Sequence, residues 1–221
     1  EIKFSGIGLH TGSLTNMRVY PQSENFGIVF NRIDLKEDIK ISALVENVVE
    51  TNRGTTIGLN GNKIYTIEHF LSALSGLGID NAYIEIDNIE PPVFDGSSRE
   101  FISKISSVGI KKYNVKKKYI TISKPIEYSN DTCSIRILPC KEFKVTYYGE
   151  FDYGDIGKQE YTYSSDKDYT DEISSARTFC SIGELIYLKE NGLIKGANIN
   201  SGIVFLNKDI NKEEIKYILS K

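Results

Sequence analysis

The sequence has no long hydrophobic run. No segment approaches the roughly 20 consecutive apolar residues that a membrane-spanning helix requires. The N-terminus also lacks the basic and then apolar pattern of a secretory signal peptide. We therefore expect neither an integral membrane protein nor an exported one, and the expected location is the cytoplasm.

The net charge is also small, and cysteine and histidine are few. The formal net charge of −3 gives no electrostatic basis for binding nucleic acid. The three cysteines, Cys133, Cys140 and Cys180, are odd in number and lack the spacing of a zinc site, so we expect them to be reduced. Only two histidines, His10 and His69, are available to any metal site built on imidazole.

What is present is the composition of a folded globular protein, with 40% hydrophobic and 26% charged residues. A chain of 221 residues can form one large or two modest domains. Five lysines with few apolar residues occupy 111–118, which is typical of a linker. We therefore predict a first domain over 1–113 and a second over 118–221.

Each half reads as several strands followed by one or two helices, which predicts the α+β class. Period-two or short apolar patterns predict strands over 1–4, 14–20, 26–30, 39–45, 55–59, 82–87, 119–126, 134–138, 143–151, 159–163 and 203–206. Alternation over 134–138 and 143–151 predicts half-buried strands. Helical spacing predicts helices within 65–78, from Ser97 to Gly109 with a Ser97–Glu100 capping box, from about 170, over 182–190 and from 213.

The helix within 65–78 has an unusual polar face. Ile67, Phe70, Leu71 and Leu74 form an apolar stripe, with Thr66 as the expected N-cap and Gly76 or Gly78 as the expected end. The opposite face carries small residues (Ser72, Ala73 and Ser75) around Glu68 and His69. Small residues around one carboxylate and one imidazole indicate a face that lines a site.

A metal ligand beside a general base is one interpretation of this pair, and a packed or surface histidine is the other. Zinc hydrolases use three protein ligands and an open position for water. His10 is the only other histidine, and no histidine follows His69 at i+4, so the HExxH pattern is absent. Residue spacing alone therefore predicts a two-domain α+β protein with a candidate Glu–His site, and both interpretations stay open.

Four motifs in chain order narrow this choice. A glycine loop, GIGLHTG, occupies Gly6–Gly12, and TIEHFLSALSGLGIDN occupies Thr66–Asn81. EPPVFDGS follows at Glu90–Ser97, and ARTF stands at Ala176–Phe179. Together they resemble the UDP-3-O-acyl-N-acetylglucosamine deacetylases of lipid A biosynthesis, and the resemblance runs through nearly the whole chain.

The resemblance implies two similar two-layer α/β-sandwich domains of mostly antiparallel strands, with helices packed between them and the second domain incomplete. It also implies a Zn²⁺-dependent amidase that releases acetate from the glucosamine nitrogen, although iron could replace zinc. His69 would be a zinc ligand, Glu68 the general base, and Thr178 a hydrogen-bond donor to the oxyanion. An acyl-chain passage would lie near 193–206. The expected substrate contacts are Leu9, Phe179, Ile194, Ile199 and Gly202.

Two motifs of the family are missing from the sequence. They are HKxxD, which supplies its other two zinc ligands, and a later GH motif with its general-acid histidine. We therefore expect a fragment that is inactive by itself. The sequences of 52–56 and 191–196 resemble those of the branch in which the deacetylase is fused to a 3-hydroxyacyl-carrier-protein dehydratase. A relative that only binds the nucleotide sugar is the alternative function.

Overall fold

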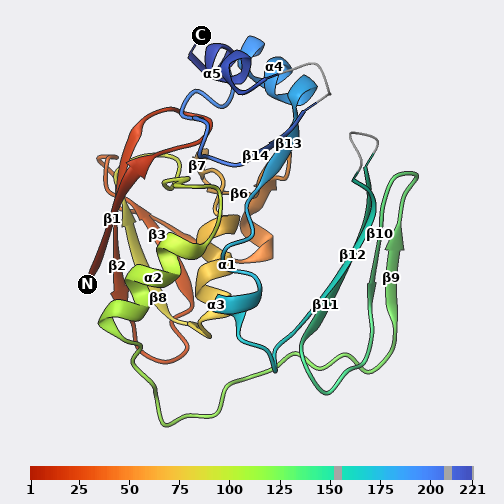
Figure 1. Ribbon diagram of the computed structural model, residues 1–221. Coiled ribbons are helices and arrows are strands. Elements are labelled where there is room, and N and C mark those ends of the chain that lie inside the picture. The colour runs from red at the N-terminus through yellow and green to blue at the C-terminus, as the bar shows by residue number, and fades with distance from the viewer. Residues whose placement is uncertain (152–155, 207–210, 221) are drawn as a thin grey trace.

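The computed structural model describes residues 1–151, 156–206 and 211–220. It confirms the α+β class: within these residues, helices and mainly antiparallel strands form a layered first half and a more open second half (Figure 1). No helix among the described residues is long and apolar enough to cross a membrane. The predicted cytoplasmic location and the domain limits stay predictions.

A five-stranded sheet forms the base of the first half. Its spatial order is β1 (Ile2–Ile7), β2 (Leu14–Pro21), β8 (Ala82–Ile86), β3 (Ile28–Arg32) and β4 (Ile39–Ser42). All neighbours are antiparallel except β3 and β8, which are parallel. Alternate side chains of β2 and β8 are buried, as their period-two patterns predict.

Two helices cover one face of this sheet. α1 (Glu68–Gly76) and α2 (Arg99–Val108) pack on it through an aromatic cluster. The ring of Phe101 in α2 lies 5.1 Å from that of Phe4 in β1 and 5.2 Å from that of Phe70 in α1, measured between centroids. The first half is therefore a two-layer α/β sandwich with one continuous core.

The start of α2 differs from its prediction. Arg99 is the first helical residue, and no side chain caps the helix. The Ser97–Glu100 capping box is wrong because the Ser97 hydroxyl oxygen accepts from the N–H of Arg99 at 3.2 Å instead of that of Glu100, and the Glu100 side chain pairs with Lys104. The predicted end at Gly109, with φ of +79°, is confirmed.

A small sheet leads into α1. Its strands are β5 (Val48–Glu50), β6 (Thr56–Leu59) and β7 (Asn62–Ile64), preceded by a short 3-10 helix (Val45–Asn47). The sequence predicted β6 alone, because β5 and β7 have three residues each and too few side chains for a periodic pattern. β7 ends just before the segment that carries Glu68 and His69.

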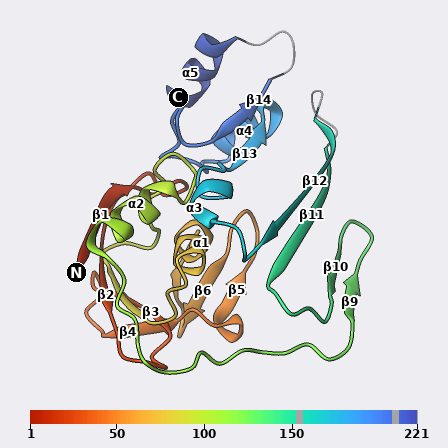
Figure 2. The ribbon, with the colours of Figure 1, turned by 60° about the horizontal axis from the view of Figure 1, so that its bottom comes forward.

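Two hairpins begin the second half, β9 (Ile126–Ser129) with β10 (Ser134–Ile137) and β11 (Lys144–Phe151) with β12 (Gly157–Ser164). They lie to one side of the first half in both views (Figures 1 and 2). The predicted strand over 119–126 is wrong, since 119–125 has no strand partner and Ile120 is 94% exposed. The half-buried alternation is also wrong, because Ile135 and Tyr147 are more than half exposed and no described element covers them.

The remaining elements are α3 (Tyr169–Glu172), β13 (Phe179–Ser181), α4 (Ile182–Glu190), β14 (Ile203–Phe205) and α5 (Lys212–Ser220). Side chains of β13, α4, β14 and α5 form a second, smaller core, whereas Tyr169 of α3 packs against the first core. β13 and β14 pair in parallel, and α4 and α5 pack together above them in the view of Figure 1. α4 begins and ends where predicted. A capping box formed by Ser181 and Glu184 fixes its start.

Candidate active site

The start of α1 is held by its connection to a buried carboxylate. Thr66 has φ of +54°, which is uncommon for a β-branched residue, and its hydroxyl donates to Oε1 of Glu90 at 2.9 Å. The prediction that Thr66 caps the helix is therefore wrong, and the residue at the N-cap position is Ile67. The predicted end is confirmed, because Gly78, with φ of +68°, forms the turn that closes the helix.

Glu68, the first residue of α1, is held by the segment before β6. The backbone N–H of Thr55 donates to Oε2 of Glu68 at 2.9 Å. A Cβ added to Gly54 would lie 3.1 Å from Oε1, so the backbone approaches the carboxylate closely. No described residue donates a hydrogen bond to Oε1, which leaves this oxygen able to accept a proton.

His69 is half-buried beside Glu68. Burial lowers the pKa of its imidazole, and the negative charges of Glu68 and Asp95 partly oppose this shift. The imidazole is therefore neutral at pH 7, which leaves one ring nitrogen able to bind a metal ion or accept a proton.

A cavity of about 230 Å³ opens on this face of α1, and we call it the Glu–His cavity. Its lining is Glu68, His69, Ser72, Ser98, Tyr169, Ile173 and Ala176. The Tyr169 hydroxyl of α3 is hydrogen-bonded to Ser72 and lies 3.3 Å from the Ser98 hydroxyl. The prediction that small residues line a site is confirmed for Ser72, whereas Ala73 is fully buried in the core and Ser75 is exposed.

A second cavity of about 220 Å³, which we call the apolar cavity, lies where the two halves meet. Among the predicted substrate contacts, Leu9, Phe179, Ile194 and Gly202 line it, together with Thr178. Ile199 is half-buried and lies outside this lining. Four aliphatic side chains of α4 and β14 also line it (Leu185, Leu188, Ile203 and Val204), and the polar lining residues include Arg53 and Glu184.

Two chain segments separate the two cavities. In the first, Arg53 lines the apolar cavity while Thr55 holds Glu68. In the second, Ala176 lines the Glu–His cavity and Thr178 lines the apolar cavity. The two cavities are therefore neighbours, although Thr178 does not border the same cavity as Glu68 and His69.

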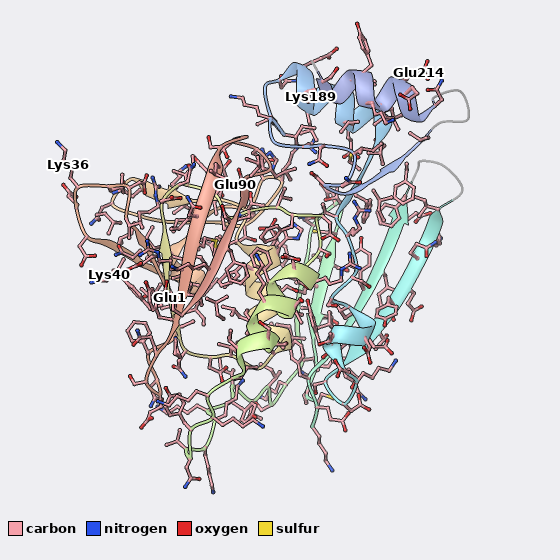
Figure 3. All side chains as sticks on the ribbon, turned by 60° about the vertical axis from the view of Figure 1, so that its left-hand side comes forward. Glu1, Lys36, Lys40, Glu90, Lys189 and Glu214 are labelled. Carbon is pink, nitrogen blue, oxygen red and sulfur yellow. The ribbon has the colours of Figure 1, made fainter. Side chains whose placement is uncertain are left out.

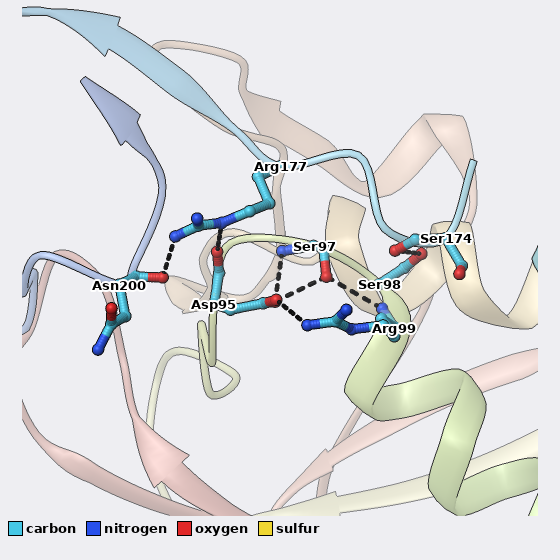
Figure 4. Close-up of polar contacts among 7 residues, drawn as sticks. All are labelled: Asp95, Ser97, Ser98, Arg99, Ser174, Arg177 and Asn200. Carbon is cyan, nitrogen blue, oxygen red and sulfur yellow. Dashed lines mark hydrogen bonds and ion pairs between the residues drawn. The ribbon is translucent and has the colours of Figure 1, made fainter. Parts of the chain in front are cut away.

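Arg177 fixes the second of these segments to the Asp95 loop (Figure 4). Its Nε donates to the carbonyl oxygen of Asp95 at 2.7 Å, and its guanidinium also donates to the carbonyl oxygen of Asn200. The Thr178 N–H donates to the Gly96 carbonyl oxygen at 2.8 Å. A Cβ at Gly96 would lie 2.5 Å from the Ser201 carbonyl oxygen, so this crossing requires glycine.

Several residues of this arrangement were absent from the sequence-based site. Gly54 and Thr55 lie in the segment 52–56, whose sequence resembles one branch of the family, but they had been assigned no role at the site. Tyr169 had no motif signal, and all three reach Glu68 or α1 only through the fold. Asp95 and Glu90 stood inside a motif but had been assigned no role. The signal that could have pointed to them is the presence of two acidic residues in a loop that Pro91 and Pro92 make rigid.

A zinc site at His69 would need two further protein ligands close to its imidazole. Among the described residues, no three His, Cys, Asp or Glu side chains converge as a metal site. A zinc hydrolase site needs three protein ligands. His69 is therefore one candidate ligand, and the described residues alone do not fit a complete zinc site.

Comparisons with known proteins give one consistent result. The UDP-3-O-acyl-N-acetylglucosamine deacetylase of Syntrophus aciditrophicus is 38% identical over 218 residues, which cover 98% of this chain and 69% of that protein. Its counterpart in Saccharophagus degradans is 38% identical over 229 residues, covering 100% of this chain and 76% of that protein.

A longer relative matches equally well. The "Bifunctional enzyme LpxC/FabZ" of Chlorobaculum tepidum is 38% identical over 224 residues, and the chain spans 48% of its length. The family model described as "LpxC: UDP-3-O-acyl N-acetylglycosamine deacetylase" matches residues 1–218. The chain therefore belongs to the UDP-3-O-acyl N-acetylglycosamine deacetylase family.

Proposed function

We propose that the protein hydrolyses the acetamide of UDP-3-O-acyl-N-acetylglucosamine, an early step of lipid A biosynthesis, and releases acetate. One observation carries the proposal beyond the family membership. The Glu–His cavity, which has the groups for hydrolysis, adjoins an apolar cavity that suits an acyl chain. The segment 176–178 borders both cavities, and the segment 53–55 joins Arg53 of the apolar cavity to the Thr55 N–H that holds Glu68. A sugar with one acyl and one acetamide substituent needs two such neighbouring sites.

Glu68 would be the general base of this reaction. Its Oε1 would take a proton from a water molecule while the water oxygen attacks the acetyl carbonyl carbon. The N–H of Thr55 fixes the orientation of the carboxylate through Oε2. The C–N bond of the tetrahedral intermediate then breaks as the nitrogen gains the proton that the water lost, and the products are acetate and the free amine.

Thr178 would donate a hydrogen bond to the oxyanion as the tetrahedral intermediate forms. Its backbone is fixed at both ends, since its N–H donates to Gly96 at 2.8 Å and its carbonyl oxygen accepts from Ile203 at 2.9 Å. This anchoring supports the role, because a preorganised donor does not have to be reoriented during the reaction. Thr178 would reach the reacting carbonyl from the apolar-cavity side.

His69 is the one described residue that we propose as a zinc ligand, and iron would suit the same ligand. Because the described residues do not complete a metal site, no step above passes through a metal ion. When bound in a hydrolase of this kind, zinc lowers the pKa of a coordinated water molecule to about 7. A fused dehydratase stays a proposal as well, supported by one relative that is named a bifunctional enzyme.

The experiment is an acetate-release assay on UDP-3-O-(3-hydroxytetradecanoyl)-N-acetylglucosamine, using the full-length natural protein with and without added Zn²⁺. Binding of the same compound is measured in parallel by calorimetry. Turnover that requires the metal supports the proposal. Tight binding without acetate release would instead favour the non-catalytic nucleotide-sugar-binding relative.

A further inference from the structure

Glu90 is a buried carboxylate with no role in the proposed reaction. Its side chain is 0% exposed, and no described residue forms an ion pair with it. Its oxygens accept from the N–H of His10 at 3.1 and 3.0 Å, the N–H of Thr11 at 2.9 Å and the hydroxyl of Thr66 at 2.9 Å. In Figure 3, Glu90 lies by the ends of β1 and β2 that face α4 and α5.

The glycine loop is shaped around this carboxylate. A Cβ added to Gly8 would lie 2.6 Å from Oε2 of Glu90, closer than the two atoms can approach. Gly8 also forms an isolated antiparallel β-bridge with Pro92, two residues after Glu90. The backbone of the glycine loop therefore packs directly against the loop that carries Glu90. The glycine at position 8 is thus explained by the carboxylate that it packs against.

The outer side of the glycine loop supports the wall of the apolar cavity. The carbonyl oxygen of His10 accepts from Lys195 at 3.3 Å, and that of Leu9 accepts from Gly196 at 3.0 Å. A Cβ added to Gly196 would overlap the carbonyl oxygen of Gly8. The turn that follows Ile194 therefore rests directly on the loop, and both Leu9 and Ile194 line the apolar cavity.

We propose that Glu90 is a positioning residue that sets the shape of the apolar cavity, and thereby the preference for acyl-chain length. Glu90 lines neither cavity and would act on the apolar cavity through the glycine loop, in addition to its hydrogen bond from Thr66 before α1. The inference rests on the proposed function, because it takes the apolar cavity as the acyl-chain site.

A carboxylate needed only for folding makes a different prediction. Removing it would leave the N–H groups of His10 and Thr11 unsatisfied and would lower stability. It would not make one acyl chain bind worse than another. A loss that depends on chain length therefore separates positioning of the cavity from a purely structural role.

The experiment compares Glu90→Ala, Glu90→Gln and Gly8→Ala in the full-length natural protein. Asp87→Ala is the matched control, because Asp87 also accepts a backbone N–H at 2.7 Å, from Asn16, but does not touch the glycine loop. kcat and KM are measured on UDP-N-acetylglucosamine carrying a 3-O-(3-hydroxytetradecanoyl) or a 3-O-(3-hydroxybutanoyl) chain. Glu90→Gln keeps one acceptor oxygen and should fall between the wild type and Glu90→Ala.

We expect Glu90→Ala to raise KM for the long-chain substrate about tenfold, with kcat and the short-chain KM changed less than about twofold. Gly8→Ala should act in the same direction, and Asp87→Ala should match the wild type. Unchanged chain-length preference, or an equal fall of kcat on both substrates, would overturn the proposal. If Glu90→Ala does not fold, Glu90→Gln and Gly8→Ala decide by the same criteria.

Failure of the proposed function gives a distinct result, since the wild type would then hydrolyse neither substrate. The probe in that case is sodium tetradecanoate, with binding measured by calorimetry. Weaker binding in Glu90→Ala than in Asp87→Ala would still support the positioning role. Equal binding in both variants, or no binding by the wild type, would overturn it.

Discussion

The backbone N–H of Thr55 donates to Oε2 of Glu68 across 2.9 Å, and the other carboxylate oxygen, Oε1, faces Gly54. One oxygen is therefore fixed by the chain and the other is available to a water molecule. The same segment continues to Arg53, which lies 3.8 Å from Glu184 and over the ring of Tyr187 in α4. The proposed base is thus tied to the helix that lines the apolar cavity.

Replacing Gly54 with alanine should displace the Glu68 carboxylate. The added Cβ would lie 3.1 Å from Oε1, so the carboxylate must shift by a few tenths of an ångström. Because catalysis depends on such positioning, we expect kcat for acetate release to fall about tenfold, with KM unchanged. Steady-state kinetics of the full-length natural protein measures both.

Gly183→Ala is the matched control for this variant. Its added Cβ would have no neighbour closer than Ser181 Oγ at 4.0 Å. Alanine is favoured over glycine in a helix by about 1 kcal/mol, so this variant should keep its kcat and gain slightly in stability. An unchanged kcat in Gly54→Ala would show that the close approach does not position the base.

Gly76→Ala should destabilise the protein although it lies in a helix. Helix propensity favours alanine by about 1 kcal/mol, but the added Cβ would overlap the ring of Tyr169. Overpacking of this kind costs about 1–3 kcal/mol, so the net effect on the free energy of unfolding should be a loss. In a Tyr169→Ala background the sign should reverse. Urea denaturation of the four proteins tests this, and a loss that persists without the ring would refute the packing of α3 on α1.

Asp34 should give the stability a measurable pH dependence. Hydrogen bonds from Arg32 hold the pKa of the Asp34 carboxyl below its usual value, with burial opposing and the Arg32 charge assisting. The contacts are 2.7 and 2.6 Å, and the side chain of Arg32 is 6% exposed. Because the folded pKa is lowered, the stabilisation is complete above the unfolded pKa of about 3.9 and is lost as pH falls through the folded value.

Asp34→Asn should therefore be less stable than the wild type at pH 7 and nearly equal to it in strong acid. We expect a difference of about 1 kcal/mol at pH 7, because the 30% exposed Asp34 side chain is partly screened by solvent. Asp38→Asn is the control, since its ion pair with Lys40 is mostly exposed. Urea titrations across the acid range measure the difference, and one that is independent of pH would contradict the account.

The fold could be predicted where local patterns determine it. α4 was predicted residue for residue, because Asn191–Gly192 marks its end; the capping box of Ser181 and Glu184 that fixes its start was found only in the structure. The strand predicted over 119–126 failed because an apolar pattern does not supply a partner strand. Helical spacing predicts that Val108 is buried, but it is the last residue of α2 and is 59% exposed.

The site could be predicted only as far as its residues are neighbours in sequence. Glu68 and His69 are adjacent on one helix, so their proximity needed no knowledge of the fold. The contact from Thr55 to Glu68 spans 13 residues, that from His10 to Glu90 spans 80, and that from Ser72 to Tyr169 spans 97. No periodic pattern encodes contacts of this kind, which arise when separate elements pack together.

The most direct test of the account is the kcat for acetate release by Glu68→Gln, measured in the full-length natural protein at saturating substrate. Glutamine keeps the shape of the side chain and an oxygen for the Thr55 N–H, but it cannot take a proton from water. The account predicts a fall in kcat of about 10²–10⁴-fold, with substrate affinity and thermal stability unchanged. A kcat equal to that of the wild type would contradict the role of Glu68 as the general base.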